Sequence, residues 1–184
     1  LSGREEMSGA FEFFLSIASP KAALKPEEVI GQPLAVRIDR GDEPPRFIHG
    51  YVSHLWAGDF SKPSEKTAPS REYRVRLVPW IWFMTRAARC FIYLPEKLEK
   101  SLQEVLDELI KRVKSYGHVQ TWNESGAASI LKSRKVEHCV QYRETDFNFL
   151  SRTLEQYGVY YYFRHESDKH TLVLSDQMNY PDAV

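Results

Sequence analysis

The feature that most constrains the fold is a change in hydrophobic period along the chain. Apolar side chains recur at every second position between residues 11 and 17, and again between 73 and 77. This is the period of a strand with one buried face. Between Pro95 and Tyr116 the apolar residues recur at three- and four-residue steps instead, as in an amphipathic helix. A chain with both periods packs helices on sheets, which indicates the α+β class.

Other segments complete the first half of this pattern. Alternation predicts strands at 34–38 and 46–56, joined by a turn from Gly41 to Pro45. Segment 58–71 is polar and rich in Pro and Ser, so we expect a solvated loop. An apolar run follows residue 77, and Pro79 predicts the end of a buried strand or a bend within it.

The long helix is expected to open at Pro95, because proline suits the first turn, and to stop at Gly117. A short strand is predicted at 136–142, where Val136, His138, Val140 and Tyr142 alternate with other residues.

A second helix and a hairpin end the pattern. The helix is expected over 147–157, capped by Thr145 or Asp146 and ended by Gly158. Segments 159–165 and 170–175 then predict a β-hairpin.

Composition excludes several classes of protein. The 25 basic and 25 acidic residues are interspersed, which argues against nucleic acid as a partner. No apolar stretch approaches the roughly 20 residues of a membrane span. The first six residues lack a basic segment followed by an apolar one, so we expect no signal peptide. Cys90 and Cys139 are far apart, so we predict neither a disulfide framework nor a zinc site, and a reducing cytoplasm fits better.

The histidines raise the hypothesis of a metal site. His49 and His54 lie in one predicted strand, at an odd offset that would place them on opposite faces, and His165 and His170 flank the turn of the last hairpin. None of these spacings is typical of metal ligands. We therefore predict no metal and no cofactor.

Catalytic residues are also not indicated. His138 precedes Cys139, but neighbouring side chains in a strand point to opposite faces, so no nucleophile and base meet there. Glu144 and Asp146 stand at a helix start, where acidic residues act as caps. We predict that the chain is not an enzyme and has no catalytic residues.

The aromatic strand Tyr160 to Phe163 raises the hypothesis of base stacking, yet only Arg164 supplies a neighbouring cation. The 24 aromatic residues (four Trp, ten Tyr and ten Phe) favour a β-rich core or an obligate interface instead. We expect this strand to be buried on both faces, one of them by another subunit.

Several longer motifs resemble the N-terminal region of the VgrG family of type VI secretion spike proteins. The strongest is CVQYRETDFNFLSRTLEQYGVYYYFRH at 139–165, which is similar to that family's C-x-Q-Y-x-E-[ST]-D pattern and its continuation. The resemblance extends over nearly the whole chain, and its other motifs are LSGREEMS at 1–8, FEFFL at 11–15, GQPLAV at 31–36, FIHGYVSHL at 47–55 and YRVRLVPWIWFMTR at 73–86.

The resemblance implies a phage tail hub-like fold, with a β-barrel-like sheet and inserted helices. We expect a β-rich domain at 1–94 and an α+β hub-like subdomain at 95–184, the latter being the start of a longer region. The family's needle, the domain that carries it and a first N-terminal strand would lie outside this piece of the protein.

The same resemblance implies a structural role. The full-length protein is expected to be a homotrimer between a hexameric tube protein and a needle, in contact with baseplate components, assembled in the bacterial cytoplasm and exported with the spike. One alternative is the hub of a phage or prophage tail. The other is the non-catalytic part of an effector whose enzymatic domain follows Val184.

Overall fold

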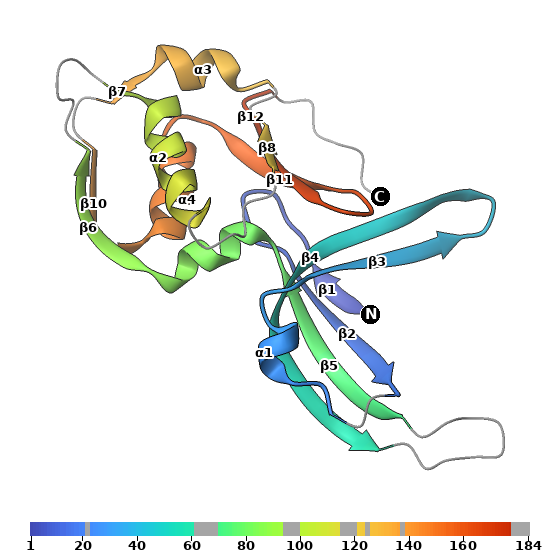
Figure 1. Ribbon diagram of the computed structural model, residues 1–184. Coiled ribbons are helices and arrows are strands. Elements are labelled where there is room, and N and C mark those ends of the chain that lie inside the picture. Colours follow the sequence, from blue (N-terminus) through green and yellow to red (C-terminus); the bar gives the residue numbers. More distant parts are fainter. Residues whose placement is uncertain are drawn as a thin grey trace. The chain divides into compact units, whose positions relative to one another are not determined.

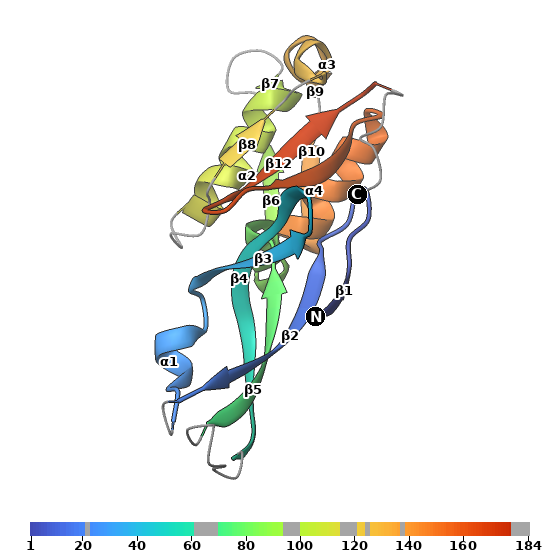
Figure 2. The same cartoon turned by 90° about the vertical axis from the view of Figure 1, so that its right-hand side faces the viewer.

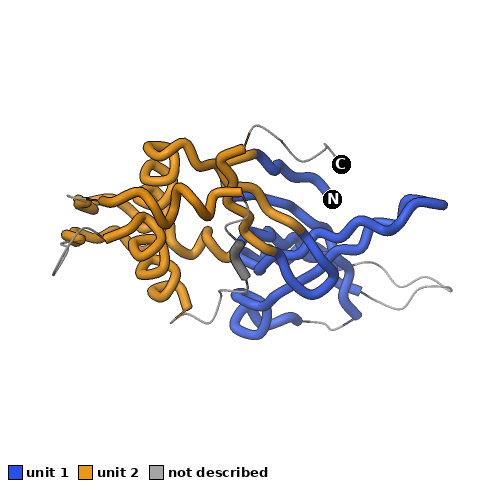
Figure 3. The backbone as a smooth tube through the Cα atoms, turned by 90° about the horizontal axis from the view of Figure 1, so that it is seen from above, with its two compact units in different colours: residues 1–6, 10–79, 165–170 blue, residues 7–9, 80–164, 171–184 orange. Residues whose placement is uncertain are grey.

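The computed structural model describes residues 1–20, 23–60, 70–93, 100–114, 121–123, 126–136 and 139–177. Its helices and mostly antiparallel sheets confirm the α+β prediction. The chain divides into two compact units (Figure 3). Unit 1 comprises residues 1–6, 10–79 and 165–170, and unit 2 comprises 7–9, 80–164 and 171–184. The boundary predicted between residues 94 and 95 falls outside the described residues and stays a prediction.

Unit 1 is built on an open five-stranded antiparallel sheet in the order β1-β2-β5-β4-β3 (Figures 1 and 2). Its strands are β1 (Ser2–Arg4), β2 (Glu12–Ser19), β3 (Pro33–Arg40), β4 (Glu43–Phe60) and β5 (Arg71–Val78). The alternating residues Phe13, Leu15, Val75 and Leu77 are buried, so the predicted period of two is confirmed. A short helix, α1 (Pro26–Val29), begins at one of the prolines that interrupt the pattern.

Strand β4 is longer than predicted at both ends. The turn from β3 occupies only Gly41 and Asp42, where Gly41 has a φ of 66° that favours glycine, and the strand already begins at Glu43. At its other end the strand continues through Gly58 to Phe60, so the start of the predicted 58–71 loop is wrong. Residues 61–69 of that loop lie outside the described part of the chain.

The main part of unit 2 begins after Pro79, where β5 has ended, as one of the two predicted alternatives, and a 3₁₀ helix, η1 (Trp80–Arg86), follows. The remaining elements are β6 (Ala88–Tyr93), β7 (Lys100–Ser101), α2 (Leu102–Lys114), β8 (Thr121–Asn123), α3 (Ala128–Ser133), β9 (Lys135–Val136), β10 (Cys139–Thr145), α4 (Asp146–Gln156), β11 (Tyr160–His165) and β12 (His170–Ser175). They form the antiparallel pairs β6–β10 and β7–β9 and the three-stranded sheet β11-β12-β8. Strands β6 and β8 were missed by the sequence patterns.

Helix α2 begins later than the prediction placed it. Lys100 and Ser101 pair with Lys135 and Val136 in a short β-ladder, so the helix starts at Leu102. Ser101 and Glu104 form a capping box, in which the Ser101 hydroxyl accepts from the Glu104 amide (3.3 Å) and the Glu104 carboxylate accepts from the Ser101 amide (2.7 Å). Pro95 and the expected stop at Gly117 lie outside the described residues. The apolar stripe is confirmed, because Leu102, Val105, Leu106, Leu109, Ile110 and Val113 are all buried.

The positions of helix α4 and of the strand after it agree with the prediction, whereas burial of that strand's second face by another subunit stays a prediction. Thr145 is the N-cap, since its hydroxyl accepts from the Asn148 amide at 3.1 Å, and this decides between the two expected caps. Gly158 follows the helix with a φ of 70°. Tyr161 and Phe163 of β11 are buried, whereas Tyr160 and Tyr162 are half-buried, so unit 2 covers only one face of this strand completely. No helix in the described ranges is long and apolar enough to span a membrane.

Candidate interaction surfaces

One face of the unit 1 sheet carries aromatic and basic side chains in adjacent rows. Phe14 of β2 pairs with Arg76 of β5, which pairs on its other side with His54 of β4. In the next row, Arg74 of β5 pairs with Trp56 of β4. Cross-strand partners share a face of the sheet. We call these five residues the aromatic–arginine face.

The three rings of this face and the Arg74 guanidinium lie close to one another. The rings of His54 and Trp56 are 5.4 Å apart and nearly parallel, at 12°. Phe14 lies 6.2 Å from Trp56, and the Arg74 guanidinium lies over the Phe14 ring at 4.6 Å. Trp56 is nevertheless 44% exposed. Tryptophan and arginine are the residues most enriched at the energetic centres of protein interfaces, so this face has the composition of a docking surface.

A second exposed surface lies on the two-stranded sheet of unit 2. Ile92 of β6 and Val140 of β10 are direct partners, with exposed fractions of 57% and 44%. Cys90 and Tyr142 are two residues further along their strands and are also exposed. We call these four residues the β6–β10 face. Contiguous apolar residues on a sheet surface are typical of a binding site for another protein.

On the opposite side of β6 and β10, a buried carboxylate accepts hydrogen bonds from side chains of both strands. Asp146, only 3% exposed, accepts from Gln141 at 2.8 Å, from Arg112 at 3.2 Å and from Arg89 at 3.2 Å. Arg112 also lies over the Tyr93 ring at 5.5 Å. This network joins β6, α2, β10 and the start of α4, and it fixes the strands that present the β6–β10 face.

The network reverses the predicted faces of β10. The sequence pattern grouped Val140 and Tyr142 as one apolar face of a strand, but both are exposed, and Cys139 and Gln141 are buried instead. Gln141 is buried because its amide donates to Asp146 and to the Glu144 carbonyl and accepts from Arg112. The period of a strand shows which side chains share a face, but it does not show which face is buried. The apolar face is usually the buried one, and in β10 it is the exposed one.

Glu144 and Asp146 do not form an acid–base pair. Glu144 receives the Arg152 guanidinium at 3.0 and 2.9 Å, and these hydrogen bonds hold the pKa of the Glu144 carboxyl below its usual range. Asp146 faces the other cations. Each carboxylate therefore has its own basic partner, which is the arrangement of structural ion pairs.

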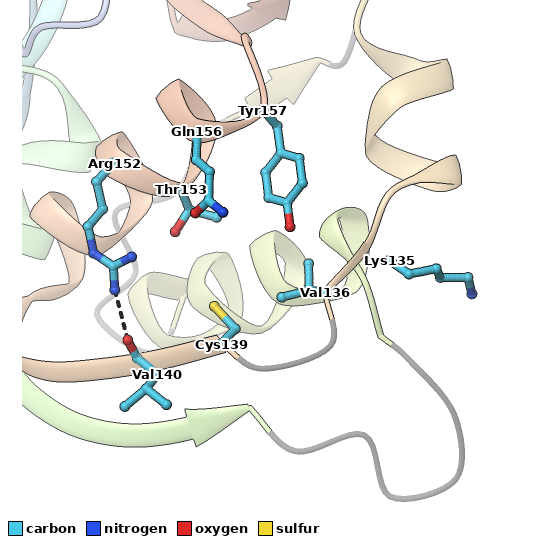
Figure 4. A pocket seen from close by; sticks show the side chains of 8 residues that line it. All are labelled: Lys135, Val136, Cys139, Val140, Arg152, Thr153, Gln156 and Tyr157. Carbon is cyan, nitrogen blue, oxygen red and sulfur yellow. Dashed lines mark hydrogen bonds between the residues drawn. The ribbon is translucent and has the colours of Figure 1, made fainter.

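A pocket of about 540 Å³ lies beside α4 and β10 (Figure 4). Arg152, Thr153, Gln156 and Tyr157 line it from the helix, and Cys139 and Val140 line it from the strand. Arg152 donates to the Val140 carbonyl at 2.8 Å and is held by Glu144, so its charge is already paired. Burial raises the pKa of the Cys139 thiol, which makes it a poor nucleophile. His138 lies outside the described residues.

The histidines of unit 1 are placed differently from the sequence expectation. A β-bulge between Val52 and His54 adds one residue to β4. Tyr51 pairs with Val78 and His54 pairs with Arg76, and these two partners share a face of β5 because they are two residues apart. The bulge therefore places Tyr51, and with it His49, on the same face as His54. The opposite-face prediction for His49 and His54 is wrong. The two histidines have different neighbours, since His54 stacks on Trp56 and His49 contacts His170.

His49, His165 and His170 are brought together by the fold, and no pattern in the sequence predicts this. Within the described residues, no group of three or more His, Cys, Asp or Glu side chains is arranged to hold a metal ion.

Similarity to known proteins identifies the family. The phage tail baseplate hub (GPD) family matches residues 4–183, and the chain belongs to this family. It is 34% identical over 180 residues to the type VI secretion system spike protein VgrG1c of Pseudomonas aeruginosa, a match that covers 96% of this chain and 22% of that protein. The corresponding values for VgrG1b of the same organism are 33% over 176 residues, 96% and 22%. The chain thus spans about a fifth of these relatives.

Solved structures agree on the fold. The E. coli c3393 protein, described as a component of the type VI secretion system with structural similarity to T4 bacteriophage tail proteins gp27 and gp5, superimposes with a TM-score of 0.71 at 22% identity. That match covers 96% of this chain and 45% of the other. The Francisella PdpA–VgrG complex gives a TM-score of 0.60 at 12% identity, over 95% of this chain and 24% of the other. The phage tail hub-like fold expected from the sequence is therefore confirmed.

Proposed function

We propose that this chain is part of the structural hub of a type VI secretion spike. The observation that carries the proposal is the family match over residues 4–183, together with relatives that are named as spike proteins. In such a protein the hub would close as a homotrimer on a hexameric tube, contact baseplate components, and leave the cytoplasm with the spike. The role needs rigid packing and large interfaces and requires no catalysis.

The surfaces of the two units support this role. The aromatic–arginine face exposes Trp56, and the β6–β10 face exposes Ile92, Val140 and Tyr142, and exposed apolar side chains that lie together often mark a site where another protein binds. The pocket beside α4 has its arginine already paired and its cysteine in an unreactive state, so it offers no evident chemistry. We propose that the chain itself has no catalytic, metal or cofactor site.

Relatives bear on the alternatives. This chain is 27% identical to the actin cross-linking toxin VgrG1 of Vibrio cholerae, but the match covers only 14% of that protein, so any enzymatic part of such a relative can lie outside the matched region. The relatives that are about a third identical to this chain over the matched region are named as secretion spike proteins, which favours secretion over a phage tail.

The test is a binding experiment with the full-length protein. It should co-sediment with the hexameric tube protein encoded in the same secretion locus, and not with the tube protein of a contractile phage. Failure to bind either tube protein would contradict the hub role. Preference for the phage tube protein would instead indicate that the chain is part of the hub of a phage tail.

A further inference from the structure

Unit 1 contains a buried pair of histidines from distant parts of the chain. His49 lies on β4, and His170 begins β12 after the turn that follows β11. Their Nδ1 atoms are 2.9 Å apart, His49 is 2% exposed, and His170 is fully buried. The contact joins segment 165–170 to the sheet across 121 positions of sequence.

The surroundings of the pair are mainly aromatic. Phe11 lies against His170 at 5.6 Å between ring centres, and Tyr51 lies 5.8 Å from the same ring. His170 is thereby enclosed by rings that cannot neutralise a positive charge as a carboxylate would.

Two titratable groups of the turn, His165 and Asp168, act electrostatically on the pair. Glu5, after β1, contacts His165, and Arg46 of β4 lies 3.9 Å from Glu5. Glu5 is directed at the Nε2 atom of His165, at 3.2 Å, and therefore partners that ring. Asp168 favours the charged form of His49, but desolvation and the neighbouring His165 oppose it more strongly.

A hydrogen bond between two Nδ1 atoms constrains the protonation of both rings. One Nδ1 must carry a proton and donate, and the other must be bare and accept. If both imidazoles are charged, both Nδ1 atoms carry protons, and two donors with like charge oppose each other at 2.9 Å. The contact therefore exists only while at least one ring is neutral.

His165 is suited to both protonation states, unlike the pair. Its Nδ1 lies 3.1 Å from both the amide nitrogen and the carbonyl oxygen of His49. A neutral ring can accept from the amide, and a charged ring can donate to the carbonyl while its Nε2 donates to Glu5. Acid therefore breaks the His49–His170 contact, whereas His165 can form hydrogen bonds in both of its protonation states.

We propose that the His49–His170 pair is an acid-sensitive latch, which holds segment 165–170 against β4 while the pair is neutral and releases it when acid charges both rings. This device is independent of the hub role. Burial lowers the pKa of His170 to about 2, and burial followed by His165 lowers the pKa of His49.

The sign of the pH effect follows from these directions. Each ring binds a proton more weakly in the folded state than in the unfolded state, so its neutral form stabilises the fold fully above the ordinary pKa of about 6.5. That contribution is lost as pH falls below about 6.5. For each histidine, the folding equilibrium constant is expected to fall about tenfold per pH unit until the ring charges in the folded state.

The direct test is NMR of the histidine side chains in the 184-residue chain. At about pH 7 one ring of the pair should carry its proton on Nδ1 and the other on Nε2, and both rings should titrate below their ordinary pKa of about 6.5 while the fold persists. The protection factor of the His49 amide, which corrects the exchange rate for the intrinsic effect of pH, should decrease as the pH falls below about 6. If both rings titrate near their ordinary pKa of about 6.5 with the fold intact, or if this protection factor does not decrease in acid, the latch does not exist.

Substitution gives a second test. Between about pH 6.5 and 5 the folding equilibrium constant of the parent chain should fall as acid is added. His170→Phe removes one histidine of the pair, so this fall should be smaller by a factor of about ten per pH unit. The matched control is His54→Phe, since His54 is a half-buried histidine of β4 outside the pair, and this variant should keep the acid-dependent loss of stability that the pair causes. Equal profiles for the parent and His170→Phe would overturn the proposal, and the NMR measurement on the parent decides the matter if His170→Phe does not fold.

Discussion

Asp146 has a structural role that its position at a helix start does not reveal. The sequence pattern indicated a residue at the beginning of α4, which is correct, since Asp146 is the first residue of that helix. Its carboxylate is turned inward to Arg89, Arg112 and Gln141, while Thr145 provides the cap. The partners come from three other elements, so local patterns carry no information about them.

Removal of this carboxylate should destabilise unit 2. Asp146→Ala leaves the largely buried Arg112 without its anionic partner, and we expect a loss of about 3 kcal/mol in the free energy of unfolding. The control is Asp39→Ala, because Asp39 is 75% exposed and its pair with Arg37 should contribute less than about 1 kcal/mol. Urea denaturation of the variants measures both, and equal effects would contradict the role given to Asp146.

The two cysteines should differ in reactivity. Cys90 is exposed on the β6–β10 face, whereas Cys139 is buried and its thiol has a raised pKa. A thiol reagent at about pH 8 should therefore modify Cys90 quickly and Cys139 only on unfolding, since the thiolate is the reacting species. Mass spectrometry of the labelled peptides identifies the site, and rapid labelling of Cys139 in the folded chain would be inconsistent with the structure.

At the scale of elements, regular periods were predictable and their ends were not. The alternation of Phe13 and Leu15 and the leucine stripe of α2 correspond to buried faces, because each repeats long enough to exceed local noise. The start of α2 was placed too early because proline is favoured at a first turn. The serine and glutamate at 101 and 104 carried the better signal, a capping box.

Strand β6 illustrates what periodicity cannot detect. Phe91, Ile92 and Tyr93 are consecutive apolar residues, of which Tyr93 is buried and the other two are exposed. Without alternation there is no strand signal. The bulge in β4 is similarly invisible, since one additional residue at Ser53 leaves the composition of the strand unchanged.

The stripe of α2 can be tested by one charge. Leu106 is fully buried, so Leu106→Asp places an unpaired carboxylate in the core of unit 2 and should lower the free energy of unfolding by at least about 3 kcal/mol. Lys111→Ala, on the exposed side of the same helix, should change it by less than about 0.5 kcal/mol. Thermal unfolding followed by circular dichroism compares them, and a silent Leu106→Asp would exclude the observed packing.

The cap of α2 has a smaller predicted effect. Ser101→Ala removes the hydroxyl that accepts from the Glu104 amide, and a loss of about 1 kcal/mol is expected. Ser101→Thr keeps a hydroxyl and should restore most of the stability. If Ser101→Ala and Ser101→Thr unfold at the same temperature, the cap contributes nothing.

At the scale of the whole molecule, the motifs of residues 139–165 and the family match give a consistent identification of the phage tail baseplate hub family. What those motifs did not reveal is which surfaces remain exposed. The aromatic–arginine face and the β6–β10 face depend on cross-strand neighbours such as Arg74 with Trp56 and Ile92 with Val140, and their register is fixed only in the folded chain.

The central claim is that the full-length protein functions as an assembly hub, and its oligomeric state tests this most directly. A closed threefold ring repeats one heterologous interface on each subunit, so the ring is complete only when three copies associate. Sedimentation equilibrium of the full-length protein at micromolar concentration should give three times the mass of one chain. A full-length protein that has the mass of a single chain at every concentration tested would contradict the account.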